Sequence, residues 1–344
     1  MYPINSFWPV SLFLAGLLLS AAGLWLMLPW LRRGFLDDPN KPNSAHANPI
    51  PSAGGIVFVL LAILFGLLSL AFQARLGLGS SGWLAWIPLI CLPLAAVGML
   101  DDQRGVSVWV RFGVQSLTAG FLLAISPLPF TWLMVIPLMV LLVAVINFIN
   151  FIDGMDGLLG GTSAVLMLAA ALTFSLVPSP DARGFIGLPM YPLVGAIVGF
   201  LVWNWSPAKV FMGDVGSTFI GSVFVGYVLQ QRDVSTAISL FLVSFPLIAD
   251  AGGCVLRRIQ AKQPILKPHK LMLYQRLNQS GWKHSQVALL YMILVSSLAI
   301  AHILSGLKGV LIIVIIQALI CLWLDQRVAV PFLVSLRRSQ RATG

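Results

Sequence analysis

Four polar side chains spaced by threes end a long apolar run near the middle of the chain, in the sequence Asn147-Phe-Ile-Asn150-Phe-Ile-Asp153-Gly154-Met155-Asp156-Gly157-Leu158. Three residues are roughly 300° of helix, so neighbours lie about 60° apart and the first three are expected to share one face of a helix end. The two glycines allow the backbone to turn tightly and approach a ligand. Amide and carboxylate oxygens beside such backbone suit a hard cation and phosphate oxygens. A plain polar helix end at a membrane surface is the alternative interpretation.

Two further acidic motifs lie at the ends of apolar runs. Asp101 and Asp102 are adjacent, and Arg111 follows about two turns into the next run. Adjacent carboxylates with a nearby arginine suit Mg²⁺ and a phosphate, although a helix cap explains the acidic pair equally well. Asp214 has a glycine on either side, so little shields it from a bound cation. A polar turn is the alternative there.

A basic segment with aromatic residues follows the ninth apolar run. Arg257 and Arg258 come shortly after Asp250, and His269 and Arg276 lie further along. Near several acidic motifs, such a segment indicates a clamp on an anionic ligand. An ordinary surface histidine, within a loop that is basic because it is cytoplasmic, is the alternative.

The elements that must position these groups are membrane-spanning helices. The chain is 58% hydrophobic and 9% charged, with a mean hydropathy of +0.93, which excludes a soluble domain. All 11 acidic residues are Asp, and the three cysteines lack the spacing of a metal site or a disulfide framework. No basic residue precedes the first apolar run, so that run is expected to remain as a span.

We predict an all-α, polytopic membrane protein with about 11 transmembrane helices in a single domain over residues 1–344. The expected spans cover 8–31, 53–72, 83–100, 107–126, 131–150, 162–178, 186–204, 216–230, 235–253, 286–304 and 308–324. Cytoplasmic loops are expected near 32–52, 101–106, 151–161, 205–215 and 254–285.

Lysine and arginine residues determine the expected orientation, because the cytoplasmic loops of membrane proteins carry an excess of both. With the N-terminus outside, 17 of them lie on the cytoplasmic side and four outside. The same alternation puts nine of the 11 aspartates on the cytoplasmic side or at inner helix ends. Ionisable groups at membrane depth cost roughly 2.5–3.5 kcal/mol each and are usually functional, so the acidic motifs are expected to form one site.

In this order the motifs resemble the polyprenyl-phosphate N-acetylhexosamine-1-phosphate transferase family, over residues of about 35 to 290. The motifs that carry the resemblance are Asp101-Asp102, Asn147-x-x-Asn150-x-x-Asp153-Gly-x-Asp156-Gly-Leu, Phe211-x-Gly-Asp214-x-Gly-Ser, Asp250 with Arg257-Arg258, and Tyr274-Gln275-Arg276-Leu277. The resemblance implies transfer of a HexNAc-1-phosphate from a UDP-sugar to undecaprenyl phosphate, with release of UMP. Such a reaction starts a lipid-linked glycan such as O-antigen, at the cytoplasmic face of a bacterial inner membrane.

The resemblance also implies roles for individual residues. Asp214 and Asn150 are expected to hold Mg²⁺, with Mn²⁺ as an alternative ion, and Asp101 and Asp102 are expected to be catalytic beside it. Asp101 is expected to deprotonate or position the lipid phosphate, and a covalent aspartyl route is the alternative.

The remaining site residues are expected to bind the donor. They are Phe211, stacked on the uracil, with Asp153 and Asp156 nearby, Arg111 at a phosphate, and His269 and Arg276 in the loop 262–285 that reads the sugar and diphosphate.

One departure from the family pattern concerns the sugar. Members acting on plain HexNAc donors often have His-x-x-His ahead of the Tyr-Gln-Arg-Leu string, but here His269 is followed by Met272. The triple histidine of the peptidoglycan-precursor branch is absent, which argues against a UDP-muramoyl-peptide donor and favours the O-antigen-initiating branch. An apolar thioether suits a C6 methyl better than a C6 hydroxyl, so a 6-deoxy HexNAc is one candidate.

The partners expected are therefore a UDP-HexNAc, undecaprenyl phosphate and membrane lipids, with a homodimer as one option and no nucleic acid. The rival class is a polytopic transporter or lipid flippase. Such a protein would carry ionisable groups near the bilayer midplane with access from both faces, whereas here they lie at helix ends on one face.

Overall fold

The structure is a computed structural model that describes residues 7–36, 49–75, 83–176, 189–264 and 269–342. These residues form helices and no strand, apart from one isolated β-bridge between Leu36 and Pro51. In chain order the elements are α1 (Phe7–Gly34), α2 (Ile56–Arg75), the 3₁₀ turn η1 (Trp83–Ala85), α3 (Ile87–Ile90), α4 (Leu92–Arg104), α5 (Val108–Ala124), α6 (Trp132–Phe151), α7 (Leu158–Leu176), α8 (Met190–Asn204), α9 (Asp214–Leu229), α10 (Val234–Leu242), α11 (Phe245–Gln260), α12 (Leu273–Gln279), α13 (His284–Arg327) and α14 (Phe332–Ala342).

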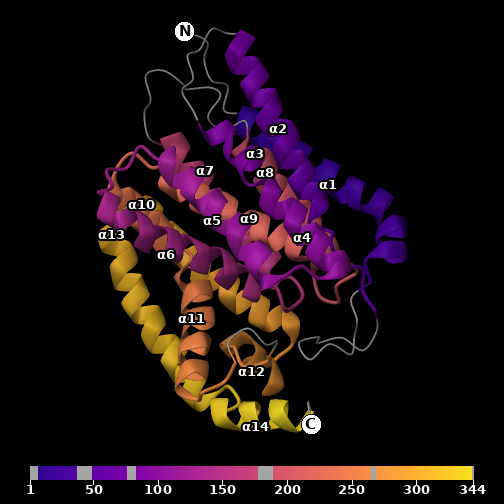
Figure 1. Cartoon of the computed structure of the whole chain (residues 1–344), viewed down its shortest axis with the longest axis vertical. Coiled ribbons are helices and arrows are strands. Elements are labelled where there is room, and N and C mark those ends of the chain that lie inside the picture. The colour runs from indigo at the N-terminus through magenta and orange to yellow at the C-terminus, as the bar shows by residue number, and fades with distance from the viewer. Residues whose placement is uncertain (1–6, 37–48, 76–82, 177–188, 265–268, 343–344) are drawn as a thin grey trace.

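The expected all-α polytopic fold is confirmed (Figure 1). Among the described residues, five helices are long and apolar enough to cross a membrane, or six if the pair α10 and α11 counts as one span. Each expected span coincides with helical structure, but two are broken. The span expected at 83–100 is divided into η1, α3 and α4, and a proline stands in the first turn of both α3 and α4. The span expected at 235–253 bends by 69° between α10 and α11.

The 44-residue helix α13 is a hairpin of two antiparallel helices. Gly306 has φ +58° and ψ −148°, a conformation that interrupts the helix and that glycine adopts without a Cβ clash. Beyond this turn, Nε2 of Gln317 donates to the carbonyl of Leu294 and to Oγ of Ser297, both at 2.8 Å. Residues 23 positions apart would be about 35 Å apart in a straight helix, so the two halves run antiparallel as the separate spans 286–304 and 308–324 predicted.

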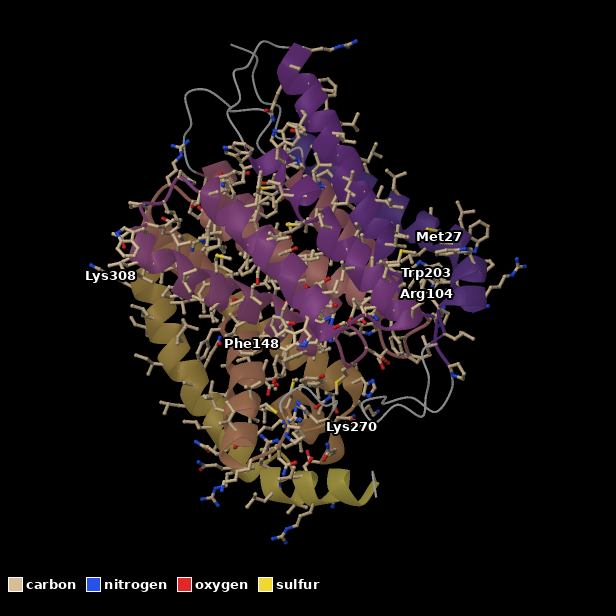
Figure 2. All side chains as sticks on the ribbon, viewed as in Figure 1. Met27, Arg104, Phe148, Trp203, Lys270 and Lys308 are labelled. Carbon is tan, nitrogen blue, oxygen red and sulfur yellow. The ribbon has the colours of Figure 1, made fainter. Side chains whose placement is uncertain are left out.

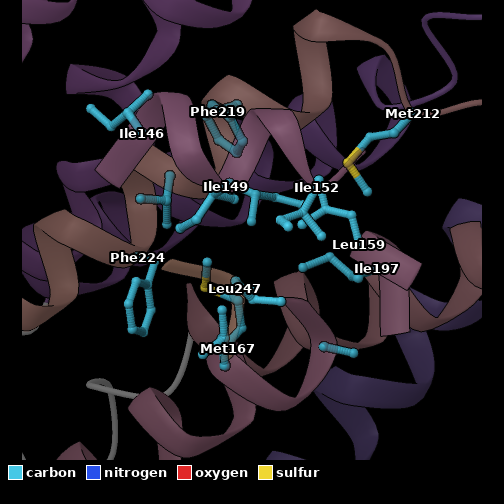
Figure 3. Close-up of a cluster of buried hydrophobic side chains, with 14 of the residues drawn as sticks. Ile146, Ile149, Ile152, Leu159, Met167, Ile197, Met212, Phe219, Phe224 and Leu247 are labelled. Atoms are coloured by element: carbon cyan, nitrogen blue, oxygen red, sulfur yellow. The ribbon is translucent and has the colours of Figure 1, made fainter. Parts of the chain in front are cut away.

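Helix α9 lies at the centre of the bundle. Every residue from Val215 to Leu229 is buried, and α9 packs against α4, α6 and α7 among others. Figure 3 shows Ile149 of α6, Phe219 of α9 and Leu247 of α11 in the same apolar cluster. Large apolar side chains are instead exposed along α1, α6 and the second half of α13, which marks these helices as lipid-facing.

The Gly306 hairpin generates a topology prediction. A reporter fused after Arg327 and one fused after Lys308 should lie on opposite sides of the membrane, because one span separates them. Figure 2 shows Lys308 on the far side of the molecule from Arg104 and Trp203. A reporter that fluoresces only in the cytoplasm should light up at the later site, and a phosphatase active only outside should work at the earlier one. Activity of the same reporter at both sites would contradict the hairpin.

Candidate active site

Four helix ends meet on one side of the bundle. Asp101 and Asp102 lie in the last turn of α4, Arg111 in the first turn of α5, Asn150 in the last turn of α6, and Asp214 is the first residue of α9. Helix ends leave backbone groups without helical partners, so they are natural sites for polar contacts. The structure thus brings together the acidic motifs that the sequence separates by more than 100 residues.

Asp102 positions the start of α9. Its two carboxylate oxygens accept the backbone N–H groups of Asp214 at 3.0 Å and Val215 at 3.2 Å. A carboxylate at a helix N-terminus is favourable because it meets free amides and the positive end of the helix dipole. The helices approach closely, since a Cβ on Gly98 would lie 2.4 Å from the carbonyl oxygen of Asp214. Gly213, with φ +75°, lets the chain turn into α9 beside this contact.

Asp101 positions Arg111. Oδ2 of Asp101 accepts from the guanidinium of Arg111 at 2.5 Å, and Oδ1 accepts the N–H of Val106 at 2.5 Å. The same guanidinium nitrogen lies 3.5 Å from Oδ2 of Asp214. Arg111 and Asp214 line a cavity on this face, whereas Asp101 and Asp102 do not. Within this structure, the acidic pair that was expected to be catalytic therefore holds the two groups that reach the cavity.

The two asparagines of α6 differ in their contacts. Nδ2 of Asn150 donates to Oδ1 of Asp214 at 2.9 Å and to Oγ of Ser217 at 2.7 Å, which joins α6 to α9. Asn147 exchanges two amide hydrogen bonds with Gln115, at 2.8 and 3.2 Å, and so joins α6 to α5. Asn150 and Asn147 share one face, as the spacing predicts, but only Asn150 contacts a carboxylate of the cluster.

The carboxylate cluster fits a divalent cation. Burial, and after it the charge of Asp214, raise the pKa of Asp102 to about 7. Burial and the contact with Asp101 raise the pKa of Asp214 to about 6, while its side chain keeps 32% of its surface exposed, so water moderates this effect. A cation among these oxygens would remove their repulsion. The described residues contain no group of three or more His, Cys, Asp or Glu arranged around one point, but Mg²⁺ commonly binds through one or two carboxylates together with phosphates and water.

The three residues expected to bind the nucleotide do not lie together. Asp153 lines the cavity. Asp156 is buried, with 2% of its surface exposed, and its Oδ2 lies 3.3 Å from Nδ1 of His284 at the start of α13. Phe211 is absent from the cavity lining, and its backbone N–H donates to the carbonyl of Pro51 at 2.7 Å. Only Asp153 of this group therefore reaches the cavity, and Asp156 joins the α6–α7 turn to α13.

Asp250 organises the basic segment. Its carboxylate accepts the N–H groups of Leu273 at 2.5 Å and Tyr274 at 3.1 Å, and the hydroxyl of Tyr291 at 2.6 Å. These bonds fix the start of α12 against α11 and α13. Tyr274 then reaches the main site, where its hydroxyl donates to the carbonyl of Phe151 at 3.1 Å.

The two residues assigned to the sugar and diphosphate loop have different environments. His269 lines the cavity, and its Nδ1 accepts the N–H of Leu271 at 3.2 Å. Burial, together with the charge of Arg258, lowers the pKa of His269 to about 4, so at pH 7 it is neutral and carries its proton on Nε2.

Arg276, which was expected to bind the sugar or diphosphate, is buried and makes structural contacts. Its guanidinium donates to the carbonyls of Leu271 at 3.1 Å and Val330 at 3.0 Å and forms an ion pair with Asp325. Arg276 is absent from the cavity lining. It therefore holds the loop in place from behind.

The cavity itself has a volume of about 690 Å³ and two chemically distinct ends. The polar end is formed by Arg111, Asn150, Asp153, Asp214 and His269. The apolar wall comes from α5 and α6 and includes Val108, Phe112, Ile136, Met139, Val140 and Val143. Ile136 and Val140 are 67% and 66% exposed on the outer surface of the bundle, so the apolar end opens toward lipid.

Comparison with known proteins agrees with this geometry. Residues 83–231 match glycosyl transferase family 4. A probable undecaprenyl-phosphate N-acetylglucosaminyl 1-phosphate transferase of Bacillus subtilis is 26% identical over 76% of this chain and 75% of its own length. An undecaprenyl-phosphate alpha-N-acetylglucosaminyl 1-phosphate transferase of Salmonella typhi is 28% identical over 78% of this chain and 76% of its own.

A decaprenyl-phosphate N-acetylglucosaminephosphotransferase of Mycobacterium leprae is 30% identical over 73% of this chain and 72% of its own. The chain belongs to the polyprenyl-phosphate N-acetylhexosamine-1-phosphate transferase family. The resemblance drawn from the motifs is thereby confirmed, and the protein is a membrane-bound polyprenyl-phosphate sugar-1-phosphate transferase.

Two residues that build the site of this transferase, Gln115 and Asp325, were not among the predicted site residues. Gln115 stands four residues after Arg111, on the same face of α5, and that spacing in an apolar run is a usable signal. Asp325 ends the last apolar run and pairs with both Arg257 and Arg276. Its partners could not be deduced, because they come from two other helices.

The contact between Gly154 and Tyr274 generates a prediction for the transferase. A Cβ on Gly154 would lie 2.2 Å from the Tyr274 hydroxyl and 3.3 Å from the next ring atom. Gly154→Ala should therefore lower stability by about 1–3 kcal/mol and reduce turnover. Adding Tyr274→Phe removes the clashing oxygen, so the double variant should be more stable than Gly154→Ala alone. Thermal unfolding in detergent measures this cycle, and Gly253→Ala, where a Cβ meets nothing within 4 Å, is the control. If the stability losses of the two single variants simply added in the double variant, the close contact between Gly154 and Tyr274 would be contradicted.

Proposed function

We infer that the protein transfers a HexNAc-1-phosphate from a UDP-sugar to undecaprenyl phosphate at the cytoplasmic face of the inner membrane, and so starts a lipid-linked glycan such as O-antigen. The observation that carries this proposal is the cavity in which a cluster of carboxylates and Arg111 meets an apolar wall that opens toward lipid. A soluble nucleotide sugar needs the first feature and a prenyl chain needs the second. The relatives named above also act on polyprenyl phosphates, as their names state.

The reaction proposed is a single displacement at phosphorus. An oxygen of the lipid phosphate bonds to the β-phosphorus of the donor, the bond from that phosphorus to the bridging oxygen breaks, and UMP leaves with the electron pair. Arg111, held by Asp101, would bind a phosphate at the polar end and stabilise its charge. This geometry supports a positioning role for Asp101 within the proposal.

Mg²⁺ is the metal we propose for this site, and Asp214 and Asn150 would hold it. When bound, it would neutralise the donor diphosphate and stabilise the UMP leaving group. The oxygens of Asp214 are the exposed carboxylate oxygens of the cluster, whereas both oxygens of Asp102 are occupied by backbone amides. Asp102 would keep Asp214 at the site by fixing the start of α9.

Asp214→Asn tests the metal assignment. This variant should lose roughly 100-fold or more in UMP release at saturating Mg²⁺, because an amide is a much weaker ligand than a carboxylate. It should also lose any rise in unfolding temperature that Mg²⁺ gives the wild type. Asp233→Asn is the matched control, since Asp233 caps α10 on the other side of the bundle and Asn is an equally good cap. Wild-type UMP release in Asp214→Asn would show that the metal lies elsewhere.

The donor proposed is a UDP-HexNAc, and Met272 favours a 6-deoxy sugar. Met272 is buried and lines the cavity beside His269 and Gln275. A neutral His269 can donate from Nε2 to a sugar or phosphate oxygen, whereas the thioether of Met272 offers an apolar contact. The names of the relatives point to N-acetylglucosamine, so the C6 substituent is the feature to test.

Comparing kcat/KM for UDP-GlcNAc and a 6-deoxy donor gives that test. A buried hydroxyl without a partner costs about 1–3 kcal/mol, so the wild type should prefer the 6-deoxy donor by roughly 5- to 150-fold. Met272→His should shift this ratio toward UDP-GlcNAc, and Met272→Leu, which stays apolar, should not. An equal ratio in the wild type, or the same shift in both variants, would remove Met272 from the determination of specificity. The transfer reaction itself is tested separately, by the release of UMP.

A further inference from the structure

The last helix of the chain lies beside the site but contributes nothing to the cavity lining. α14 follows the end of α13 after a short turn, and Figure 1 shows it across the lower end of the molecule, below α12. Its sequence, Phe-Leu-Val-Ser-Leu-Arg-Arg-Ser-Gln-Arg-Ala, contains three arginines and no acidic residue. The reaction proposed above gives this helix no role.

One face of α14 is attached to the loop that closes the cavity. Oγ of Ser335 donates to the carbonyl of Lys270 at 3.2 Å and contacts Oε1 of Gln279 at 2.9 Å, and Ser335 is buried. The ring of Phe332 lies 6.0 Å from the guanidinium carbon of Arg276, within the range of a cation–π contact. Lys270 directly follows the cavity residue His269, so a shift of α14 would move the wall of the cavity.

A free face of α14, formed by the exposed residues Leu333, Val334, Arg337 and Arg338, carries both apolar and basic groups. Leu333 is 63% exposed, and Val334, Arg337 and Arg338 are also exposed. At about 100° per residue, Leu333 and Arg337 point about 160° away from Ser335, and Val334 and Arg338 lie about 100° and about 60° from it, both to the same side. Neither arginine forms an ion pair with a carboxylate among the described residues. On a helix that faces only water, exposed apolar side chains are usually few and arginines are often paired with carboxylates.

The exposed residues near this free face are of the types found where a bilayer ends. Trp323 is 58% exposed and lies one turn before the end of α13, and tryptophan is enriched at membrane interfaces. On the adjacent α11, Leu256 and Ile259 are exposed in the last turns. The exposed apolar residues at the start of α14 therefore continue a lipid-facing surface, and the arginines follow where headgroups are found.

We propose that α14 is a binding surface for anionic lipid headgroups of the cytoplasmic leaflet, and that its attachment to the membrane holds the loop of His269 and Met272 in place. An amphipathic helix with basic and apolar residues on one face binds such surfaces through burial and charge together. The basic charge without acidic partners selects anionic lipids over zwitterionic ones. The second half of the proposal, the effect on the loop, rests on the function proposed above.

The test uses the full-length protein and the double variant Arg337→Gln/Arg338→Gln. Its matched control is Arg32→Gln/Arg33→Gln, an equally adjacent and exposed pair at the cytoplasmic end of α1. Unfolding temperature is measured in detergent with added phosphatidylglycerol or phosphatidylcholine. The apparent KM for the UDP-sugar is measured in vesicles of phosphatidylcholine alone and in vesicles with about a third phosphatidylglycerol.

Phosphatidylglycerol should stabilise the wild type and the control more than phosphatidylcholine does, and the α14 variant should lose this difference. Each arginine near an anionic surface contributes about fivefold to the equilibrium, so the two give a ceiling of about 30-fold on the change in apparent KM. If phosphatidylglycerol raised the unfolding temperature equally in all three proteins, or in none, the lipid site would be overturned. The free face of α14 would then bind a different partner. A stability response without a KM response would overturn only the coupling to the loop. Because unfolding needs no turnover, failure of the proposed reaction would not obscure the lipid result.

Discussion

The position of α9 depends on one electrostatic contact, the carboxylate of Asp102 against the first amides of that helix. α9 is buried along its length, so its N-terminal end cannot be adjusted without moving α4, α6 and α7. The absence of side chains on Gly98 and Gly213 allows this contact, since a Cβ at either would lie within 2.5 Å of its neighbour across the junction. The apolar packing of the bundle and the location of Asp214 are therefore set by the same few atoms.

The site is built in two layers. Arg111, Asp214 and Tyr274 reach the cavity, and each is held by a different aspartate behind it, namely Asp101, Asp102 and Asp250. Aspartate has one rotatable bond fewer than glutamate, so less side-chain entropy is lost when it is fixed in such a contact. This gives a physical account of aspartate at these three positions.

Much of the fold could be predicted from the sequence, because apolar runs of sufficient length have few alternatives to membrane-spanning helices. The Gly306 hairpin is an example, since the pattern predicts two spans with a short turn. The bend between α10 and α11 could not be predicted in this way, because hydropathy identifies an apolar segment but not the direction in which its helix runs. Among the site residues, the convergence of Asp101, Asn150 and Asp214 followed from placing charged helix ends on one side of the membrane.

The individual contacts of these residues could not be predicted. Arg276 was predicted to bind the donor because basic loops often bind anions, yet its guanidinium contacts Asp325, the distant carbonyl of Val330 and the nearby carbonyl of Leu271. Asp156 was grouped with Asp153 by the family resemblance, but the turn after α6 directs it to His284. The contacts that decide the two roles are with Asp325 and His284, each more than 45 residues away in the chain. The sequence around Arg276 or Asp156 contains no information about such distant partners.

Val255 of α11, the helix that follows the 69° bend after α10, lines the cavity together with the exposed residues Ile136 and Val140 of α6. For a ligand with a long hydrocarbon tail, this arrangement makes the bilayer the compartment from which the site is filled. The quantity that governs occupancy is then the mole fraction of acceptor in the membrane. Diluting the membrane with inert lipid would starve such a site even when the total amount of acceptor per litre is unchanged, whereas the nucleotide side would continue to follow ordinary aqueous concentration.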